Sequence, residues 1–175
     1  RGRVLEIGIG SGLSLGYYPT DVQQVVGIDP SAELLAQCRR RIEGHPELPS
    51  TELVQCGAEE LPFADDSFDT VVAFLVFCTI PEPERAAREM RRVLKPGGRL
   101  IFFEHVHAPE PGLARWQDRL NPLWRPIACG CNLNRETRAV FERAGFDLND
   151  VRVAHHPDIP LPLVRPVIEG CPQNR

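Results

Sequence analysis

The stretch "VLEIGIGSG", residues 4–12, decides how this chain folds. Apolar residues lead directly into three glycines spaced two apart, Gly8, Gly10 and Gly12. Glycines at the end of a buried strand permit a sharp turn and let a ligand approach the backbone closely. The stretch therefore predicts a first strand that ends in a ligand-binding turn.

Strand and helix patterns alternate along the rest of the chain. Strands are predicted at residues 3–9, 24–29, 51–56, 67–77, 99–106, 147–156 and 163–170, and helices at 29–42, 81–95 and 134–146. A short helix is expected to end near residue 18. Residues 108–130 contain Pro, Trp and Gly, show no clean period and are interpreted as an insertion over the edge of the sheet. Asp29 is a plausible N-cap of the helix over 29–42, with Pro30 at its first helical position. This order predicts an α/β fold, a Rossmann-like doubly wound sheet of about seven mostly parallel strands.

Length and composition indicate one soluble domain. The 175 residues carry a net charge of −4, which gives no reason to expect nucleic acid as a partner. No apolar run approaches the ~20 residues of a transmembrane helix, and no signal peptide is visible. Six scattered cysteines suggest reduced thiols and a cytoplasmic location. Cys129 and Cys131 lack the CxxC spacing of most zinc sites, so no metal site is predicted.

Three cofactor types could fit the glycine turn. A nucleotide-phosphate loop needs a Lys after the glycines, and none is present. A dinucleotide turn needs a third glycine where Leu13 stands. The third type has an acid in the strand itself, and here Glu6 lies two residues before Gly8. A carboxylate there would repel a pyrophosphate, which favours S-adenosylmethionine, a cofactor with an ammonium, a sulfonium and no phosphate.

A second acid lies at the end of the second predicted strand. Asp29 is placed where a carboxylate can accept hydrogen bonds from both ribose hydroxyls of a nucleoside cofactor. A nicotinamide dinucleotide would use the same residue, and Asp29 could also simply cap its helix. The two roles can coexist because a carboxylate has several lone pairs.

The first 105 residues resemble the class I S-adenosylmethionine-dependent methyltransferases, in the methyltransferase type 11 group. The matching segments, in order, are "VLEIGIGSG", "VVGIDPSAELL", "GAEELPFADDSFDTVVAFLVF" and "EMRRVLKPGGRLIF". The resemblance implies a seven-stranded sheet whose last strand is antiparallel. It also implies S-adenosylmethionine as methyl donor and S-adenosylhomocysteine as product.

The resemblance assigns cofactor-binding roles by position. It places the methionine part against the glycine turn, the ribose at Asp29 and adenine near Pro30 and the segment after the third strand. The expected cofactor residues are Glu6, Gly8, Gly10, Gly12, Asp29, Pro30, Ala58, Glu59, Phe74 and Leu75. Gly57 departs from the pattern, because many relatives have an Asp there that accepts from the adenine amino group.

Residues 104–170 resemble the microsomal alkyl-thiol methyltransferase-like proteins. The matching pieces are "EHV", a Trp with a nearby Gln, "P-x-W", "GCNL-x-RET", "ERAGF" and "VRP-x-I-x-G". This implies a small, lipophilic methyl acceptor, best interpreted as a thiol. Methylation of a phospholipid amine or a quinol, and a non-catalytic cofactor-binding domain, remain alternatives. Those relatives have an apolar N-terminal anchor that this chain lacks, so membrane association cannot be carried over.

The predicted acceptor side consists of residues near the end of the fifth strand and in the segment that follows it. His105 is the candidate catalytic base, and Glu104 could orient a histidine or point outward. The candidate substrate-pocket residues are Trp116, Trp124, Asn132 and His155. The expected domain spans residues 1–175, with 108–133 as a substrate-side insertion. The first strand begins near Arg3, so the N-terminal lid helices of relatives are expected to be absent.

Overall fold

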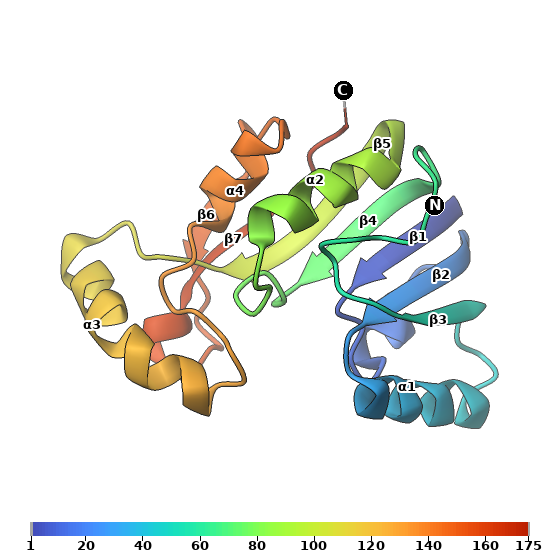
Figure 1. Ribbon diagram of the computed structural model, residues 1–175, viewed down its shortest axis with the longest axis horizontal. Coiled ribbons are helices and arrows are strands. Elements are labelled where there is room, and N and C mark those ends of the chain that lie inside the picture. Colours follow the sequence, from blue (N-terminus) through green and yellow to red (C-terminus); the bar gives the residue numbers. More distant parts are fainter. Residues whose placement is uncertain (1, 175) are drawn as a thin grey trace.

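Seven strands form one sheet in the computed structural model, which describes residues 2–174 (Figure 1). The domain limits predicted at residues 1 and 175 lie outside that range. The strands are β1 (Gly2–Ile7), β2 (Val22–Asp29), β3 (Thr51–Gln55), β4 (Phe68–Phe74), β5 (Leu94–His105), β6 (Arg152–His155) and β7 (Pro166–Gly170). Their order is β3-β2-β1-β4-β5-β7-β6. The first five strands are parallel, and β7 is antiparallel to β5 and β6, so the predicted fold class is confirmed.

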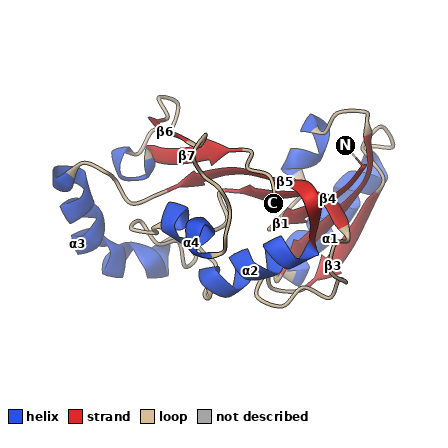
Figure 2. Ribbon diagram, turned by 90° about the horizontal axis from the view of Figure 1, so that it is seen from above, coloured by secondary structure: helices blue, strands red, loops and turns tan. Residues whose placement is uncertain are grey.

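Helices lie on both faces of this sheet. They are η1 (Leu13–Tyr17), α1 (Ala32–Gly44), α2 (Pro83–Val93), α3 (Pro111–Ile127), α4 (Thr137–Arg143) and η2 (Pro162–Val164). Figure 2 shows α2 and α4 together on one side, with α3 beyond the β6–β7 end. Side chains alternate along β2 accordingly: Val26 belongs to the large core under α2, and Val25 packs with Leu35 and Cys38 of α1.

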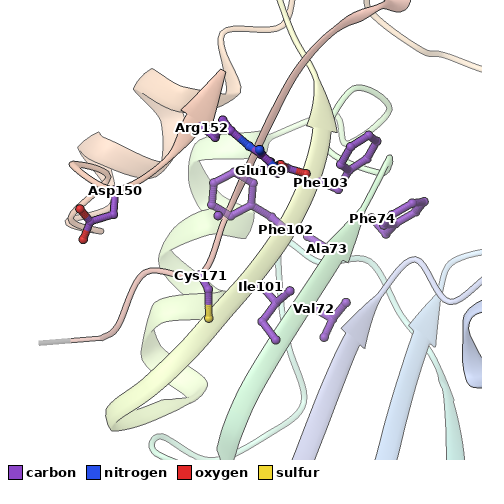
Figure 3. A pocket seen from close by; sticks show the side chains of 11 residues that line it. Val72, Ala73, Phe74, Ile101, Phe102, Phe103, Asp150, Arg152, Glu169 and Cys171 are labelled. Atoms are coloured by element: carbon purple, nitrogen blue, oxygen red, sulfur yellow. Dashed lines mark hydrogen bonds and ion pairs between the residues drawn. The ribbon is translucent and has the colours of Figure 1, made fainter. Parts of the chain in front are cut away.

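Part of the α1-side sheet face is open at β4, β5 and β7. Val72, Phe74, Ile101 and Phe103 line a depression of about 550 Å³ there (Figure 3). Phe74 is 57% exposed and stacks on Phe103 with ring centroids 5.2 Å apart. Their neighbours Ala73 and Phe102 face the core instead. No helix among residues 2–174 covers these aromatic rings, which leaves an apolar patch beside the carboxyl end of β4.

Residues 108–130, interpreted from the sequence as an insertion without a clean period, contain the 17-residue helix α3. Pro122 and Pro126 lie inside the helix and hide its period from sequence inspection. Gln117 is fully buried and anchors the helix. Its Oε1 accepts from Ala108 N (2.7 Å), and its Nε2 donates to Val106 O (3.1 Å) and Leu163 O (2.8 Å).

Two local predictions also need correction. The strand predicted over 67–77 ends at Phe74, because Leu75 adopts a left-handed conformation (φ 52°) and the chain turns away. The helix predicted to begin at Asp29 has Ser31 as its N-cap, whose hydroxyl accepts from Leu34 N (3.2 Å). Pro30 therefore precedes the helix.

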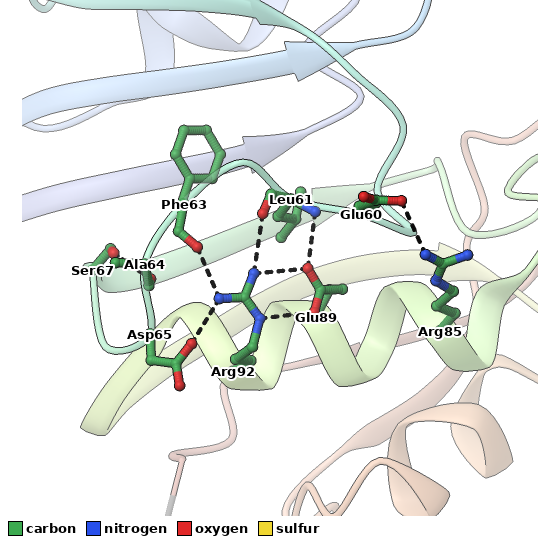
Figure 4. Close-up of polar contacts among 9 residues, drawn as sticks. All are labelled: Glu60, Leu61, Phe63, Ala64, Asp65, Ser67, Arg85, Glu89 and Arg92. Carbon is green, nitrogen blue, oxygen red and sulfur yellow. Dashed lines mark hydrogen bonds and ion pairs between the residues drawn. The ribbon is translucent and has the colours of Figure 1, made fainter.

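Arg92 of α2 holds the segment that follows β3 against the helix (Figure 4). Its guanidinium donates to Leu61 O (3.1 Å), Phe63 O (2.8 Å) and Asp65 Oδ1 (2.8 Å). It also forms a bidentate pair with Glu89, in which Nε donates to Oε1 (2.8 Å) and Nη2 donates to Oε2 (2.7 Å). The same Oε2 of Glu89 accepts from Leu61 N (2.9 Å). The segment from 61 to 65 is thus fixed by one charged network rather than by regular structure.

Replacing Arg92 by Leu is expected to lower the free energy of unfolding by about 2 kcal/mol, because Glu89 and two carbonyls lose a charged donor. Arg85→Leu is the matched control on the same helix. Its ion pair with Glu60 is exposed on both sides and is expected to contribute less than about 1 kcal/mol. Urea denaturation of both variants measures the difference, and equal losses would contradict the assignment.

No helix among the described residues is long and apolar enough to span a bilayer.

Candidate functional site

The glycine turn lies at the carboxyl end of β1, where its backbone folds back against β2. Gly8, Gly10 and Gly12 all have left-handed φ values, 68°, 56° and 77°. A Cβ on Gly8 would lie 2.4 Å from Val76 Cγ2, whereas a Cβ on Gly10 would find its nearest atom 4.0 Å away, in open space. The turn is therefore tightly packed on one side and accessible to a ligand at Gly10.

Glu6 orients this turn from within β1. Its side chain is buried, and Oε2 accepts from the Tyr18 hydroxyl at 2.8 Å. Burial raises the pKa of Glu6 above its ordinary value, and hydroxyl hydrogen bonds, including that from Tyr18, oppose the shift. The acid thus ties the strand to the end of η1, and binding of a cationic group by Glu6 stays a prediction.

Asp29 links the turn to the end of β2. Its Oδ2 accepts from Gly10 N (3.1 Å), and its Oδ1 accepts from Ser31 N (2.9 Å). The side chain is 7% exposed. Each carboxylate oxygen can accept more than one hydrogen bond, so both could also receive hydroxyl donors. The geometry fits the ribose role predicted for Asp29, next to the accessible backbone of Gly10.

The segment after β3 contains the other predicted cofactor residues. Ala58 is buried, and Glu59 Oε1 accepts from Glu82 N at 3.4 Å. A Cβ on Gly57 would lie 2.6 Å from Glu59 Oε2, so Glu59 fills the space beside the glycine. Pro30 is exposed at the end of the neighbouring strand, and its carbonyl accepts from Gln55. The adenine roles of these residues stay predictions.

Glu104 supports the loop that follows β4. It is fully buried, and its two oxygens accept from Val76 N (3.0 Å) and Phe77 N (3.1 Å). Burial raises the pKa of Glu104 to about 8. The side chain therefore neither points outward nor orients a histidine. It holds the left-handed turn at Leu75, at the end of β4. Phe74 and Leu75 at this strand end are predicted cofactor-binding residues.

His105, the last residue of β5, lies beside two cysteines. It is 5% exposed, and its Nε2 is 3.1 Å from Cys131 Sγ. Cys78 completes the group, and the ligand atoms of the three residues lie within 4.8 Å of one another. A hydrogen bond from the Cys78 thiol lowers the pKa of Cys131, with further help from His105, whereas the pKa of Cys78 is raised.

The predicted substrate-pocket residues divide into two pairs. Trp124 and Asn132 belong to the surroundings of Cys131: the indole of Trp124 helps to lower the pKa of Cys131, and Asn132 Nδ2 donates to Cys78 O (2.9 Å). Trp116 is 56% exposed on α3, and His155 is exposed with Nε2 3.1 Å from Glu110. Sequence reasoning missed the group formed by Cys78, His105 and Cys131, because its members are 26 or more positions apart.

Comparison with known proteins places this arrangement in a family. Residues 5–102, which hold the glycine turn, Asp29 and β4, match the family model described as "Methyltransferase domain". The chain belongs to the S-adenosylmethionine-dependent methyltransferases. The matched range ends just before His105, so the residues predicted for the acceptor side, from His105 onward, lie outside it.

Two curated relatives cover much of the chain. Phosphatidylethanolamine N-methyltransferase of Cereibacter sphaeroides is 44% identical over 126 residues, 68% of this chain and 62% of that protein. Thiol S-methyltransferase TMT1A of Homo sapiens is 37% identical over 171 residues, 95% of this chain and 68% of that protein. The chain spans about 60% of the length of the first curated relatives that it matches.

Solved structures confirm the methyltransferase fold. The YcgJ protein of Bacillus subtilis superposes with a TM-score of 0.72 at 27% identity, covering 86% of this chain and 63% of that one. A SAM-dependent methyltransferase of Methanosarcina mazei gives a TM-score of 0.75 at 24% identity, covering 98% and 91%.

Gly8 and Gly10 are expected to respond differently to substitution. Gly8→Ala drives a methyl group into Val76 and should cost about 2 kcal/mol or more of folding stability. Gly10→Ala meets no neighbour and should cost only about 1 kcal/mol for its positive φ. Its methyl group would instead occupy the accessible side of the turn and weaken S-adenosylhomocysteine binding at least about tenfold.

Urea denaturation without ligand and calorimetric titration with S-adenosylhomocysteine separate the two effects. Wild-type affinity in Gly10→Ala would show that the cofactor does not approach the turn there.

Proposed function

We propose that this chain transfers a methyl group from S-adenosylmethionine to a small lipophilic thiol. The cofactor supplies an activated methyl group on a sulfonium. The observation that carries the thiol assignment is the group Cys78, His105 and Cys131 at the end of β5, where an imidazole nitrogen lies 3.1 Å from one sulfur and the three donor atoms lie within 4.8 Å of one another. The similarity to thiol S-methyltransferase TMT1A, which extends over 95% of the chain and so spans the positions of this group, supports it.

Residues at the carboxyl ends of β1 and β2 bind the cofactor, and those at the end of β5 bind the acceptor. The Gly10 backbone and the Asp29 carboxylate fit the amino-acid and ribose parts of the cofactor, with Glu6 fixing the turn. Methyl transfer is an in-line displacement, so fixed alignment of donor and acceptor can supply much of the rate enhancement. The acceptor must be a thiolate, because the thiolate rather than the thiol is the nucleophile. We place the acceptor at the His105 end of the site, beside this group.

Two measurements test this function. Calorimetry should detect binding of S-adenosylmethionine and S-adenosylhomocysteine to the folded protein, and no binding of either would refute the proposal. A product assay with alkyl thiols, phenols, quinols and phosphatidylethanolamine should give S-methyl products in preference to all others. Activity confined to oxygen or nitrogen acceptors would remove the thiol assignment.

A phospholipid amine is the second candidate acceptor. The relative in Cereibacter sphaeroides carries the name phosphatidylethanolamine N-methyltransferase. Trp116, Leu123 and Ile127 recur at helical spacing along α3 and are 56%, 67% and 81% exposed, a stripe that suits contact with a lipid surface. Assays with phosphatidylethanolamine vesicles should distinguish the two acceptors, since an enzyme acting on lipid would lose activity in Leu123→Glu and keep it on soluble thiols.

A further inference from the structure

Cys78, His105 and Cys131 have the composition and spacing of a zinc site. One imidazole and two thiolates are ligands that zinc prefers, and a tetrahedral zinc ion separates such donor atoms by roughly 3.5 to 3.8 Å. In this structure the three donor atoms lie within 4.8 Å of one another, with His105 Nε2 and Cys131 Sγ 3.1 Å apart. Shifts of less than about 1 Å would bring all three donors onto one ion.

The backbone around the three residues is fixed by hydrogen bonds. Asn132 donates to Cys78 O through both its backbone N and its Nδ2, each at 2.9 Å, so residue 131 is held against residue 78. Glu104 holds the loop that leads to Cys78, and β5 delivers His105 at its last position. Ligands on such a rigid frame are already positioned for an ion.

The three ligand side chains are largely shielded from solvent. Cys78 is 4% and His105 is 5% exposed, and Cys131 is partly exposed. Nδ1 of His105 is buried and has no hydrogen-bond partner within residues 2–174, so the ring is oriented through Nε2 alone.

We propose that Cys78, His105 and Cys131 bind one zinc ion, whose fourth coordination position holds the sulfur of the methyl acceptor. Three protein ligands and one open position are the arrangement of catalytic rather than structural zinc. Zinc binding lets the acceptor thiol release its proton to solvent at neutral pH. This inference rests on the proposed thiol methylation and names how the acceptor is held and activated.

The transfer step balances in charge and electrons. A sulfur lone pair of the zinc-held thiolate forms the new S–CH₃ bond as the C–S bond to the sulfonium breaks. The bonding electrons of that C–S bond stay on the sulfur of S-adenosylhomocysteine. An anion and a sulfonium cation thus become two neutral thioethers, and the product thioether, a weaker zinc ligand, dissociates.

Metal binding is tested first on the whole chain without any activity assay. Chelator-treated, reduced protein is titrated with Zn²⁺ against a chromophoric chelator, and in parallel with Co²⁺, which reports tetrahedral thiolate coordination by its absorption. We expect one equivalent of metal with thiolate-to-Co²⁺ charge transfer. No binding, or a Cys78–Cys131 disulfide that persists under reductant, would overturn the proposal.

Variants identify the ligands. Cys131→Ala and His105→Ala are each expected to weaken Zn²⁺ binding by at least about 100-fold, more than the loss of an outer partner of a ligand. Cys171→Ala, an exposed thiol elsewhere, should bind Zn²⁺ as the wild type does. Circular dichroism establishes that each variant is folded. Because Cys131 is partly exposed, Cys131→Ala is less disruptive to folding than His105→Ala. Unchanged affinity in folded Cys131→Ala would overturn the assignment.

The acceptor role is tested separately from the methyltransferase function. Adding an alkyl thiol to the Co²⁺ protein should shift its absorption, and metal removal should lower thiol methylation at least tenfold, restored by one equivalent of Zn²⁺. Full thiol methylation by metal-free protein would overturn the zinc role and leave the proposed function standing. Tight cofactor and zinc binding without any thiol methylation would instead refute the thiol function.

Discussion

Asp29→Ala is expected to weaken S-adenosylhomocysteine binding by about 100-fold or more. The carboxylate oxygens lie beside the accessible backbone of Gly10, and in our proposal they accept from the two ribose hydroxyls. Hydrogen bonds to a charged group contribute about 1.5 to 3 kcal/mol each, so the loss of two gives at least this factor. Calorimetric titration below the unfolding temperature of the variant measures the change in affinity.

Asp69→Ala is the matched control for Asp29. Asp69 also accepts from a backbone N–H, that of Arg3 at 2.8 Å, and pairs with Lys95 at 2.7 Å, but it belongs to the opposite end of the sheet. Its removal should lower stability without changing cofactor affinity. If Asp69→Ala and Asp29→Ala weaken binding equally, the effect is one of folding, and the ribose role of Asp29 fails.

Gln117→Leu is expected to lower the free energy of unfolding by about 3 kcal/mol, because three backbone groups, two of them buried, lose their partner at once. The side chain joins Ala108 and Val106 after β5 to Leu163 near β7. Leucine has a similar size and no polar atoms, so it fills the space and leaves those groups unpaired. Urea denaturation followed by circular dichroism measures the loss.

Arg119→Ala, exposed on the same helix, is the control for Gln117 and should change stability by less than about 0.5 kcal/mol. A Gln117→Leu variant as stable as Arg119→Ala would show that α3 is held by its apolar contacts alone.

The sheet and the cofactor side follow from local sequence patterns. A buried strand, a glycine turn and an acid at the next strand end are each readable within a few residues, and the structure brings Gly10 and Asp29 into contact as their positions imply. Parallel strands place their carboxyl ends at one edge, so the approximate location of His105 was also predictable.

The acceptor side depends on contacts that no local pattern reveals. The prolines at 122 and 126 interrupt the helical pattern of α3, so no helix was predicted there. The end of β4 was placed too late, because "FLVF" is apolar, yet its last backbone amides bond a carboxylate from β5. Cys78 and Cys131 have no motif spacing, and only the fold of the loops around Asn132 brings them together.

The position of β7 in the sheet has a consequence for how the chain folds during synthesis. The last strand lies between β5 and β6 rather than at an edge, and Asn174 Nδ2 donates to Leu94 O at 2.8 Å across 80 positions. A ribosome-bound chain lacking residues 166–174 therefore has β5 as an open edge and β6 without its partner. Such unpaired edges promote aggregation, so the sheet depends on residues 166–174 for protection while it is being made.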